Sequence, residues 1–196
     1  MSLELVKAYL EKVQTVLQNI PPEPVAAATR VLIDAHLGEK TIFVVGNGGS
    51  AATSSHFVCD LAKGTINGSG KRCRAISLND NMPLLTAYAN DVSYDDVFSG
   101  YLQNLAGSGD VLVAFSGSGN SPNIIKALRA ARQCGATTIG VTGFEGGQMR
   151  AIVDHCIVVP SNSMQHIEDA HMIIAHVMFL GLCLRVNPTS PYLAVI

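Results

Sequence analysis

The sequence predicts an α/β domain in which a doubly wound, five-stranded parallel sheet follows N-terminal helices and precedes a long C-terminal helix. Two observations carry this prediction. Five short β-branched runs are apolar at nearly every position, which is typical of parallel strands covered by helices on both faces. Helical patterns separate these runs, and strands that alternate with helices pair in parallel through right-handed crossovers.

The elements are expected in the following order along the chain. Apolar residues recur at helical spacing over 3–20, and Pro21 and Pro22 end that helix before a second one over 24–37. The expected strands are the β-branched runs at 41–45, 73–78, 111–116, 137–142 and 155–159. Helical patterns follow at 51–63, 83–88 with 94–106, 122–134 and 148–151, and the long helix covers 165–185.

These elements predict one domain. A chain of 196 residues with 48% hydrophobic residues is long enough for a single sizeable core. We expect this domain to span residues 1–196, with a helical pair at 1–38, the α/β core and C-terminal helix at 39–186, and a tail at 187–196. The tail carries two prolines, which predict an extended segment.

The composition argues against several classes of partner. A net charge of -2 gives no electrostatic footprint for nucleic acid or an anionic membrane. The longest apolar stretch is interrupted by His171 and His176, so it predicts a core or interface helix rather than a membrane span. Only 14% of the residues are charged, and we therefore expect other copies to cover part of the surface in a homo-oligomer.

The N-terminus and the cysteines indicate a cytoplasmic protein. Glu4 and Lys7 lie among the first apolar residues, where a signal peptide has an uncharged core. The five cysteines are scattered and form no CxxC pair. They predict reduced thiols rather than a disulfide framework or a thiolate metal site.

Two loops rich in glycine and serine follow predicted strands. "GNGGSAATSS" comes after the first strand and "SGSGNSPN" after the third. Glycines let the backbone approach an anion, helix N-termini offer free N–H groups, and serine hydroxyls donate hydrogen bonds. Tight turns capped by Ser50 and Ser121 are the alternative. Neither loop has the spacing of a P-loop or a dinucleotide loop, so we expect a small phosphorylated ligand.

Ionisable residues gather in two places. His56 and Asp60 are four residues apart on one helix face, as two metal ligands, an acid–base pair or an ordinary surface pair would be. Glu168, His171 and His176 lie on a helix that is otherwise strongly apolar. Buried polar groups need partners, so this second set indicates a polar site rather than core filling.

The segments "VVGNGGSAATSSHF", "ANDVSYDDVFSGYL", "GDVLVAFSGSGNSPNIIKAL" and "IEDAHMIIAH" resemble the sugar isomerase (SIS) domain family, with its flavodoxin-like sheet, and within it the phosphoheptose isomerase branch. The resemblance covers about residues 3–185 and implies a homotetramer with active sites between subunits. It implies a phosphate site and a sugar site. The implied phosphate ligands are Ser116, Ser118 and Ser121, and the implied sugar contacts are Asn47, Gly48, Ser50, Asn90, Asp91 and Glu168.

The resemblance also implies a metal site for zinc or another divalent ion. Its ligands would be His56, Asp60, Glu168 and His176, a nitrogen and oxygen set that suits such ions. This branch usually has glutamate in place of Asp60 and glutamine in place of Glu168, which puts rate or substrate specificity in doubt. Glu168 and His176 are eight residues apart, roughly 12 Å along a helix, so His171 is an alternative or supporting ligand.

The expected reaction is an aldose–ketose exchange through a cis-enediol, which requires two proton-transferring groups and a means of polarising the oxygens. We assign Asp60 and His176 to the proton transfers. The implied substrate is sedoheptulose 7-phosphate and the product D-glycero-D-manno-heptose 7-phosphate. Two alternatives stay open: a non-catalytic SIS protein that binds a phosphosugar or a replication initiator, and an isomerase for a related phosphosugar of a nucleotide-heptose or capsule pathway.

Overall fold

The computed structural model describes residues 2–67 and 70–194. The five strands, β1–β5, are Thr41–Gly46, Arg74–Ser77, Val111–Ser116, Thr137–Thr142 and His155–Val158. The helices α1–α8 are Leu3–Gln18, Pro22–Leu37, Gly49–Cys59, Met82–Asp91, Val97–Gln103, Pro122–Gln133, Met149–Ile152 and Met164–Val186. The described residues also form three short helical turns: η1 (Asp60–Gly64), η2 (Tyr94–Asp96) and η3 (Pro191–Leu193).

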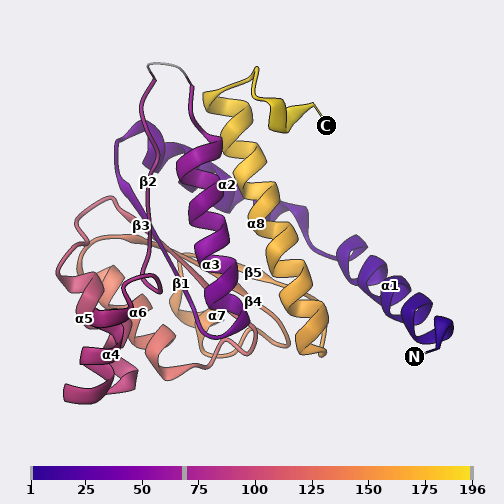
Figure 1. Cartoon of the computed structure of the whole chain (residues 1–196), viewed down its shortest axis with the longest axis horizontal. Helices are drawn as coiled ribbons and strands as arrows, with labels where there is room; N and C mark the ends of the chain where they lie inside the picture. The colour runs from indigo at the N-terminus through magenta and orange to yellow at the C-terminus, as the bar shows by residue number, and fades with distance from the viewer. Residues whose placement is uncertain (1, 68–69, 195–196) are drawn as a thin grey trace.

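The strands form one parallel sheet in the order β2-β1-β3-β4-β5 (Figure 1). This arrangement confirms the predicted fold class. The register pairs Gly46 with Phe115 and Ser116 with Thr142, so the carboxyl ends of β1, β3 and β4 lie at the same edge. Both glycine- and serine-rich loops leave the sheet at this edge, which is where open parallel sheets bind ligands.

The central strands are buried on both faces because their alternate side chains enter two separate cores. Ile42 and Val44 of β1 pack with α2, α3 and α8 on one face. Phe43 and Val45 pack with α5 and α6 on the other. Every residue of β1 and β3 is buried. The continuous apolar runs in the sequence are therefore explained by two helical layers.

The long helix α8 belongs to the first of these cores. By length and composition it resembles a membrane span, but half of its most apolar window is buried within the fold. It runs beside α3, and α1 projects from the body next to its N-terminal half (Figure 1). Tyr9 of α1 donates a hydrogen bond to the Asp169 carboxylate at 2.6 Å, and this partner raises the pKa of the tyrosine. Within the described chain, α1 contributes no buried residue.

Three local predictions differ from the structure. The second helix begins at Pro22, because proline fits the first helical turn, whose N–H groups need no partner inside the helix. The helix expected over 51–63 begins at Gly49 and widens into the π turn η1 at Asp60. The tail was expected to be extended, which is wrong over Pro191–Leu193, where it forms a 3-10 turn.

Candidate active site

A cavity of about 140 Å³ opens at the carboxyl edge of the sheet. Its walls come from the loops after β1 and β3 and from the start of α8, and none of the described residues that line it is a lysine or arginine. The lining residues are Asn47, Ser50, Phe115, Ser116, Gly117, Ser118, Ser121, Met164 and Glu168. Among the described residues, the hydroxyls of Ser50, Ser116 and Ser121 make no hydrogen bond within the chain. They are therefore available to donate to an anion in the cavity.

The backbone fixes the shape of the serine-rich loop. Gly119 has φ of 64°, and a Cβ atom there would lie 2.2 Å from the carbonyl oxygen of Gly146. The loop after β4 braces this turn, since the N–H of Met149 donates to the Gly119 carbonyl at 3.0 Å and the N–H of Gly143 to the Gly117 carbonyl at 2.9 Å. The hydroxyls are thus presented by a turn that only glycine permits.

Glu168 brings a carboxylate into the same cavity. Its Oε1 and Oε2 atoms lie against Gly49, where a Cβ would meet them at 2.9 and 3.0 Å. Gly49 is the first residue of α3, so the carboxylate sits at a helix N-terminus, where the helix dipole favours a negative charge. The N-terminus of α3, which could bind an anionic group of a ligand, is therefore already next to the Glu168 carboxylate.

The second feature of the site is a cluster of His56, Asp60 and His176, whose ligand atoms all lie within 4.8 Å of one another. The Nε2 atoms of the two histidines are 3.1 Å apart. Asp60 Oδ2 is 3.3 Å from His56 Nε2 and 3.7 Å from His176 Nε2. Asp60 begins the π turn η1, a kind of local widening that is frequent at functional sites.

This cluster has the dimensions of a metal site. Ligand atoms bound tetrahedrally at about 2.0–2.1 Å from zinc lie roughly 3.3 Å from one another. The three separations in the cluster, 3.1, 3.3 and 3.7 Å, bracket that value. Two imidazole nitrogens and one carboxylate oxygen also form a donor set typical of catalytic zinc, which keeps its fourth position open.

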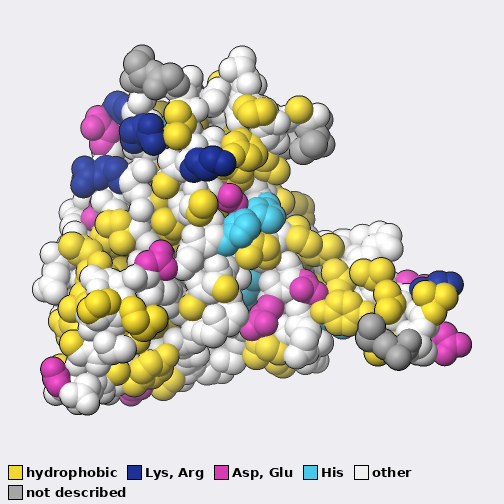
Figure 2. Space-filling model, in the orientation of Figure 1, with side chains coloured by type: hydrophobic (Ala, Val, Ile, Leu, Met, Phe, Trp, Pro, Cys, Tyr) yellow, Lys and Arg dark blue, Asp and Glu magenta, His cyan; other side chains and the backbone are white. Residues whose placement is uncertain are grey.

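Glu168, the fourth predicted ligand, is not a member of this cluster. It precedes His176 by eight residues, which is roughly 12 Å along α8. The structure instead places its carboxylate in the cavity. The cluster and the cavity therefore occupy two positions along the same pair of packed helices, α3 and α8. Figure 2 shows histidine side chains at the surface beside an acidic side chain, over the region where α3 and α8 lie side by side in Figure 1.

The geometry agrees with comparisons to known proteins. Residues 8–143 match the SIS domain. A phosphoheptose isomerase of Aliarcobacter butzleri is 36% identical over 178 residues, which cover 90% of this chain and 94% of that protein. The chain belongs to the phosphoheptose isomerase family of SIS domain proteins. A solved phosphoheptose isomerase from Neisseria gonorrhoeae superposes with a TM-score of 0.84 at 31% identity, covering 91% of this chain and 97% of that one.

Several other predicted residues of this SIS domain lie outside the cavity and the cluster. Asn90 and Asp91 are exposed at the end of α4, where the Asn90 amide donates to the Asp91 carboxylate at 2.7 Å. Gly48 caps α3 with φ of 54° and is exposed. His171 is 1% exposed, packs beside Phe115, and has no hydrogen bond of good geometry to a described residue on either ring nitrogen. Burial lowers its pKa to about 4, and the Thr142 backbone opposes this in part.

Two asparagines that were not predicted as site residues support the first loop of the SIS domain. Asn79 clamps Gly46, since its amide donates to the Gly46 carbonyl at 2.7 Å and its Oδ1 accepts from the Gly46 N–H at 3.2 Å. Asn123 pairs with Asn47 through two hydrogen bonds of 2.9 Å. Asn79 directly follows the strand predicted at 73–78, and a polar residue just beyond a strand end was the available signal for it. Asn123 lies in the first turn of α6, and no comparable local pattern marked it.

Proposed function

We propose that this protein is a metal-dependent aldose–ketose isomerase that converts sedoheptulose 7-phosphate to D-glycero-D-manno-heptose 7-phosphate. The observation that carries the proposal is the pairing of a serine-lined anion cavity with a cluster of two histidines and one aspartate on the same two helices. The name phosphoheptose isomerase, shared by relatives 36% identical to this chain, supports the choice of a seven-carbon substrate.

The cavity binds the phosphate and the near part of the sugar. Ser116, Ser118 and Ser121 donate to the phosphate oxygens at the N-terminus of α6, where the helix dipole favours an anion. Asn47, in the loop after β1, and Ser50, in the first turn of α3, face the sugar. The remaining carbon chain extends along the contact between α3 and α8 toward the histidines.

Asp60 and His176 carry the proton transfers in this proposal. Both imidazole contacts of the Asp60 carboxylate use Oδ2, which leaves Oδ1 for a substrate proton. Loss of a proton from C1 converts the C1–H bond into the C1–C2 double bond of a cis-enediol, while O2 gains a proton. Return of a proton at C2, with loss of the O1 proton, yields an aldose of identical atomic composition.

The predicted divalent ion fits the three residues of the cluster. His56, Asp60 and His176 would hold it, with zinc as the first candidate by donor set. Such an ion, when bound, polarises substrate oxygens as a Lewis acid. Glu168 is proposed as a contact to the sugar at the cavity, and Asn90 and Asp91 remain candidates for the distal hydroxyls only if another copy of the chain brings them to the site.

The test combines metal analysis with proton exchange. We expect purified protein to contain close to one divalent ion per chain, and to incorporate deuterium at C1 or C2 of sedoheptulose 7-phosphate in deuterated water. Product and exchange are followed by NMR, and a chelator should abolish both. Protein that binds the phosphosugar but exchanges no proton, with or without added zinc, manganese or iron, contradicts the proposal and favours a non-catalytic binding protein.

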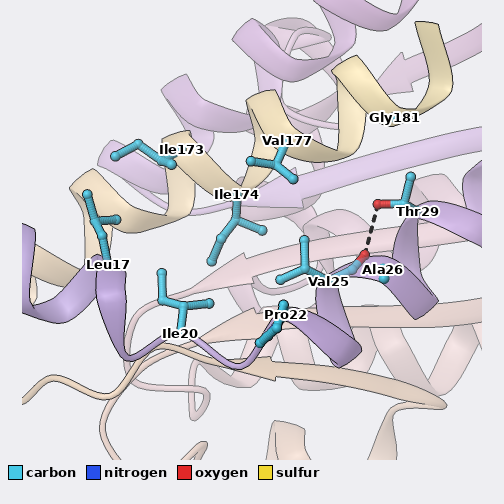
Figure 3. A pocket seen from close by; sticks show the side chains of 10 residues that line it. All are labelled: Leu17, Ile20, Pro22, Val25, Ala26, Thr29, Ile173, Ile174, Val177 and Gly181. Atoms are coloured by element: carbon cyan, nitrogen blue, oxygen red, sulfur yellow. Dashed lines mark hydrogen bonds between the residues drawn. The ribbon is translucent and has the colours of Figure 1, made fainter. Parts of the chain in front are cut away.

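We further propose that the protein is a cytoplasmic homotetramer. The structure offers two apolar surfaces for assembly. Leu3, Leu5 and Leu10 of α1 are 58–68% exposed. A groove of about 520 Å³ opens between the α1–α2 junction and α8, with Ile173 and Val177 on its rim (Figure 3). The five free cysteines support a reducing compartment.

Sedimentation velocity tests the assembly. We expect a species of four chains, and we expect Leu5→Glu with Leu10→Glu to shift it to smaller species because the apolar stripe of α1 gains charge. Gln14→Glu, at an exposed polar position of the same helix, is the matched control. A wild-type protein that sediments as a monomer at micromolar concentration contradicts this part of the proposal.

A further inference from the structure

One asparagine from the loop after β1 and one from the first turn of α6 form a reciprocal amide pair at the wall of the cavity. Asn47, after β1, donates from Nδ2 to Asn123 Oδ1 at 2.9 Å. Asn123, in the first turn of α6, donates from Nδ2 to Asn47 Oδ1, also at 2.9 Å. Asn123 is 2% exposed, whereas Asn47 lines the cavity. The pair thus joins the two loops that form the proposed sugar and phosphate sites.

The backbone fixes which end of each amide is oxygen. Turning both amides over together would preserve the pair, so the two hydrogen bonds alone do not set its polarity. The N–H of Ile124 lies 2.9 Å from Asn123 Oδ1 and can only donate. The atom that faces it must therefore be oxygen. This orients Asn123, and Asn123 in turn orients Asn47.

The hydrogen bonds of Asn47 leave one group free. Its Oδ1 accepts from Asn123 Nδ2 and from the Tyr94 hydroxyl at 3.3 Å, which uses both lone pairs of the oxygen. Its Nδ2 donates one of two N–H groups to Asn123. The second N–H is unused within the described chain, and Asn47 lines the cavity.

Tyr94 is itself held in place from α6. It belongs to the turn η2, whose Asp96 carboxylate accepts two hydrogen bonds from Lys126 Nζ at 2.9 and 3.0 Å. Lys126 and Asn123 lie one turn apart on α6. One helix therefore anchors both groups that occupy the Asn47 oxygen.

We propose that Asn123 and Tyr94 are positioning residues that lock Asn47 as a hydrogen-bond donor, so that the cavity selects a ligand with an acceptor oxygen, a carbonyl or hydroxyl of the phosphosugar, at that point. This inference rests on the proposed function for the identity of the ligand. The polarity of the amide pair does not depend on it.

Asn123→Asp is the sharpest substitution, because it replaces one amide nitrogen by oxygen at nearly constant shape. The ionised carboxylate of this variant faces Asn47 with two acceptors, so an O···O contact remains whichever way the Asn47 amide turns. We expect kcat/KM for sedoheptulose 7-phosphate at pH 8 to fall at least about tenfold. We also expect the ratio of variant to wild-type kcat/KM to recover at lower pH, where a protonated carboxyl can donate as the amide did.

Tyr94→Phe is the milder substitution, since Tyr94 is 54% exposed and the change removes only its hydroxyl. We expect unchanged thermal stability and a loss of about threefold in kcat/KM, mainly through KM. Tyr101→Phe on the neighbouring helix α5 is the matched control. In an Asn47→Ala background, Tyr94→Phe should cause no further loss, because the tyrosine acts through Asn47.

Two kinetic results would overturn the inference. One is a folded Asn123→Asp protein with wild-type kcat/KM at pH 8, and the other is a Tyr94→Phe loss that persists in full without Asn47. Neutron diffraction of the deuterated, ligand-free protein gives an independent reading. Deuterons on the Asn123 atom that faces Asn47 Oδ1 support the inference, and their absence there contradicts it. A wild-type protein without turnover refutes the proposed function alone, since the neutron result still decides the polarity.

Discussion

The cavity and the histidine cluster are built in opposite ways. The cavity is formed by loops that leave neighbouring strands, and its groups are held by backbone hydrogen bonds; Ser116 is 5% exposed. The cluster is formed by three side chains, from α3, from the turn η1 that continues it and from α8. The side chains of His56 and His176 are 49% and 44% exposed. Anion binding at the cavity thus depends on the backbone shape and is divided among several hydrogen-bond donors. Metal binding at the cluster depends on each of its three side chains.

The largest expected effects of substitution are at the histidine cluster, where each side chain is needed. His176→Ala should lower kcat at least about 10³-fold and reduce bound metal, since it removes both a ligand and a proton-transferring group. His56→Ala should reduce metal content equally but recover more activity when metal is added in excess. Metal analysis and turnover provide the measurement, with His155→Ala on β5 as control. Wild-type metal content in both variants would show that the cluster is not a metal site.

Beneath the cavity, the buried His171 predicts a dependence of stability on pH. Its pKa in the folded protein is about 4, below the value of about 6.5 for an unfolded histidine. The unfolded chain therefore gains a proton first as the pH falls, and the free energy of unfolding decreases by about 3 kcal/mol between pH 6.5 and 4. Denaturant unfolding of wild type and His171→Leu at several pH values measures the difference, and parallel curves would contradict this assignment.

A backbone change should damage the cavity and spare the cluster. Gly119→Ala places a Cβ atom 2.2 Å from a carbonyl oxygen at φ of 64°, so we expect the serine loop to shift and KM for the phosphosugar to rise about tenfold or more. Metal content should not change. Gly107→Ala, whose Cβ would meet only the Asp110 carboxylate at 3.8 Å, is the control. A loss of metal in Gly119→Ala would mean that the two regions are not independent.

The smallest expected effect is that of substituting Glu168, which lines the cavity but was also predicted as a ligand of the metal. If Glu168 acts at the cavity, Glu168→Gln removes a like charge near the phosphate and lowers KM by about threefold, with unchanged metal content. If it becomes a ligand in the loaded enzyme, bound metal falls instead. Metal analysis of the variant beside its phosphosugar affinity separates these outcomes.

The same contrast explains what the sequence alone could predict. The strands at 111–116 and 137–142 were predicted to the residue, because apolar runs and the loops that follow them are local features. The pair of His56 and Asp60 was also visible, since it lies within one helical turn. The sequence could not show that His176, rather than Glu168, joins this pair, because that depends on how α8 packs against α3. The amide pair of Asn47 and Asn123 could not be predicted, because it joins a loop and a helix start that are 76 residues apart in the sequence.

The stiffness of α8 has one more consequence. A single helix supplies a residue to the cavity and, eight positions later, a residue to the histidine cluster, at a spacing that its hydrogen-bonded backbone does not allow to change. If the cavity binds the phosphate as proposed, the sugar must reach from the cavity to the histidine cluster over this fixed spacing. Under that proposal, a phosphosugar with fewer carbons would place its carbonyl farther from the imidazoles than a seven-carbon one does.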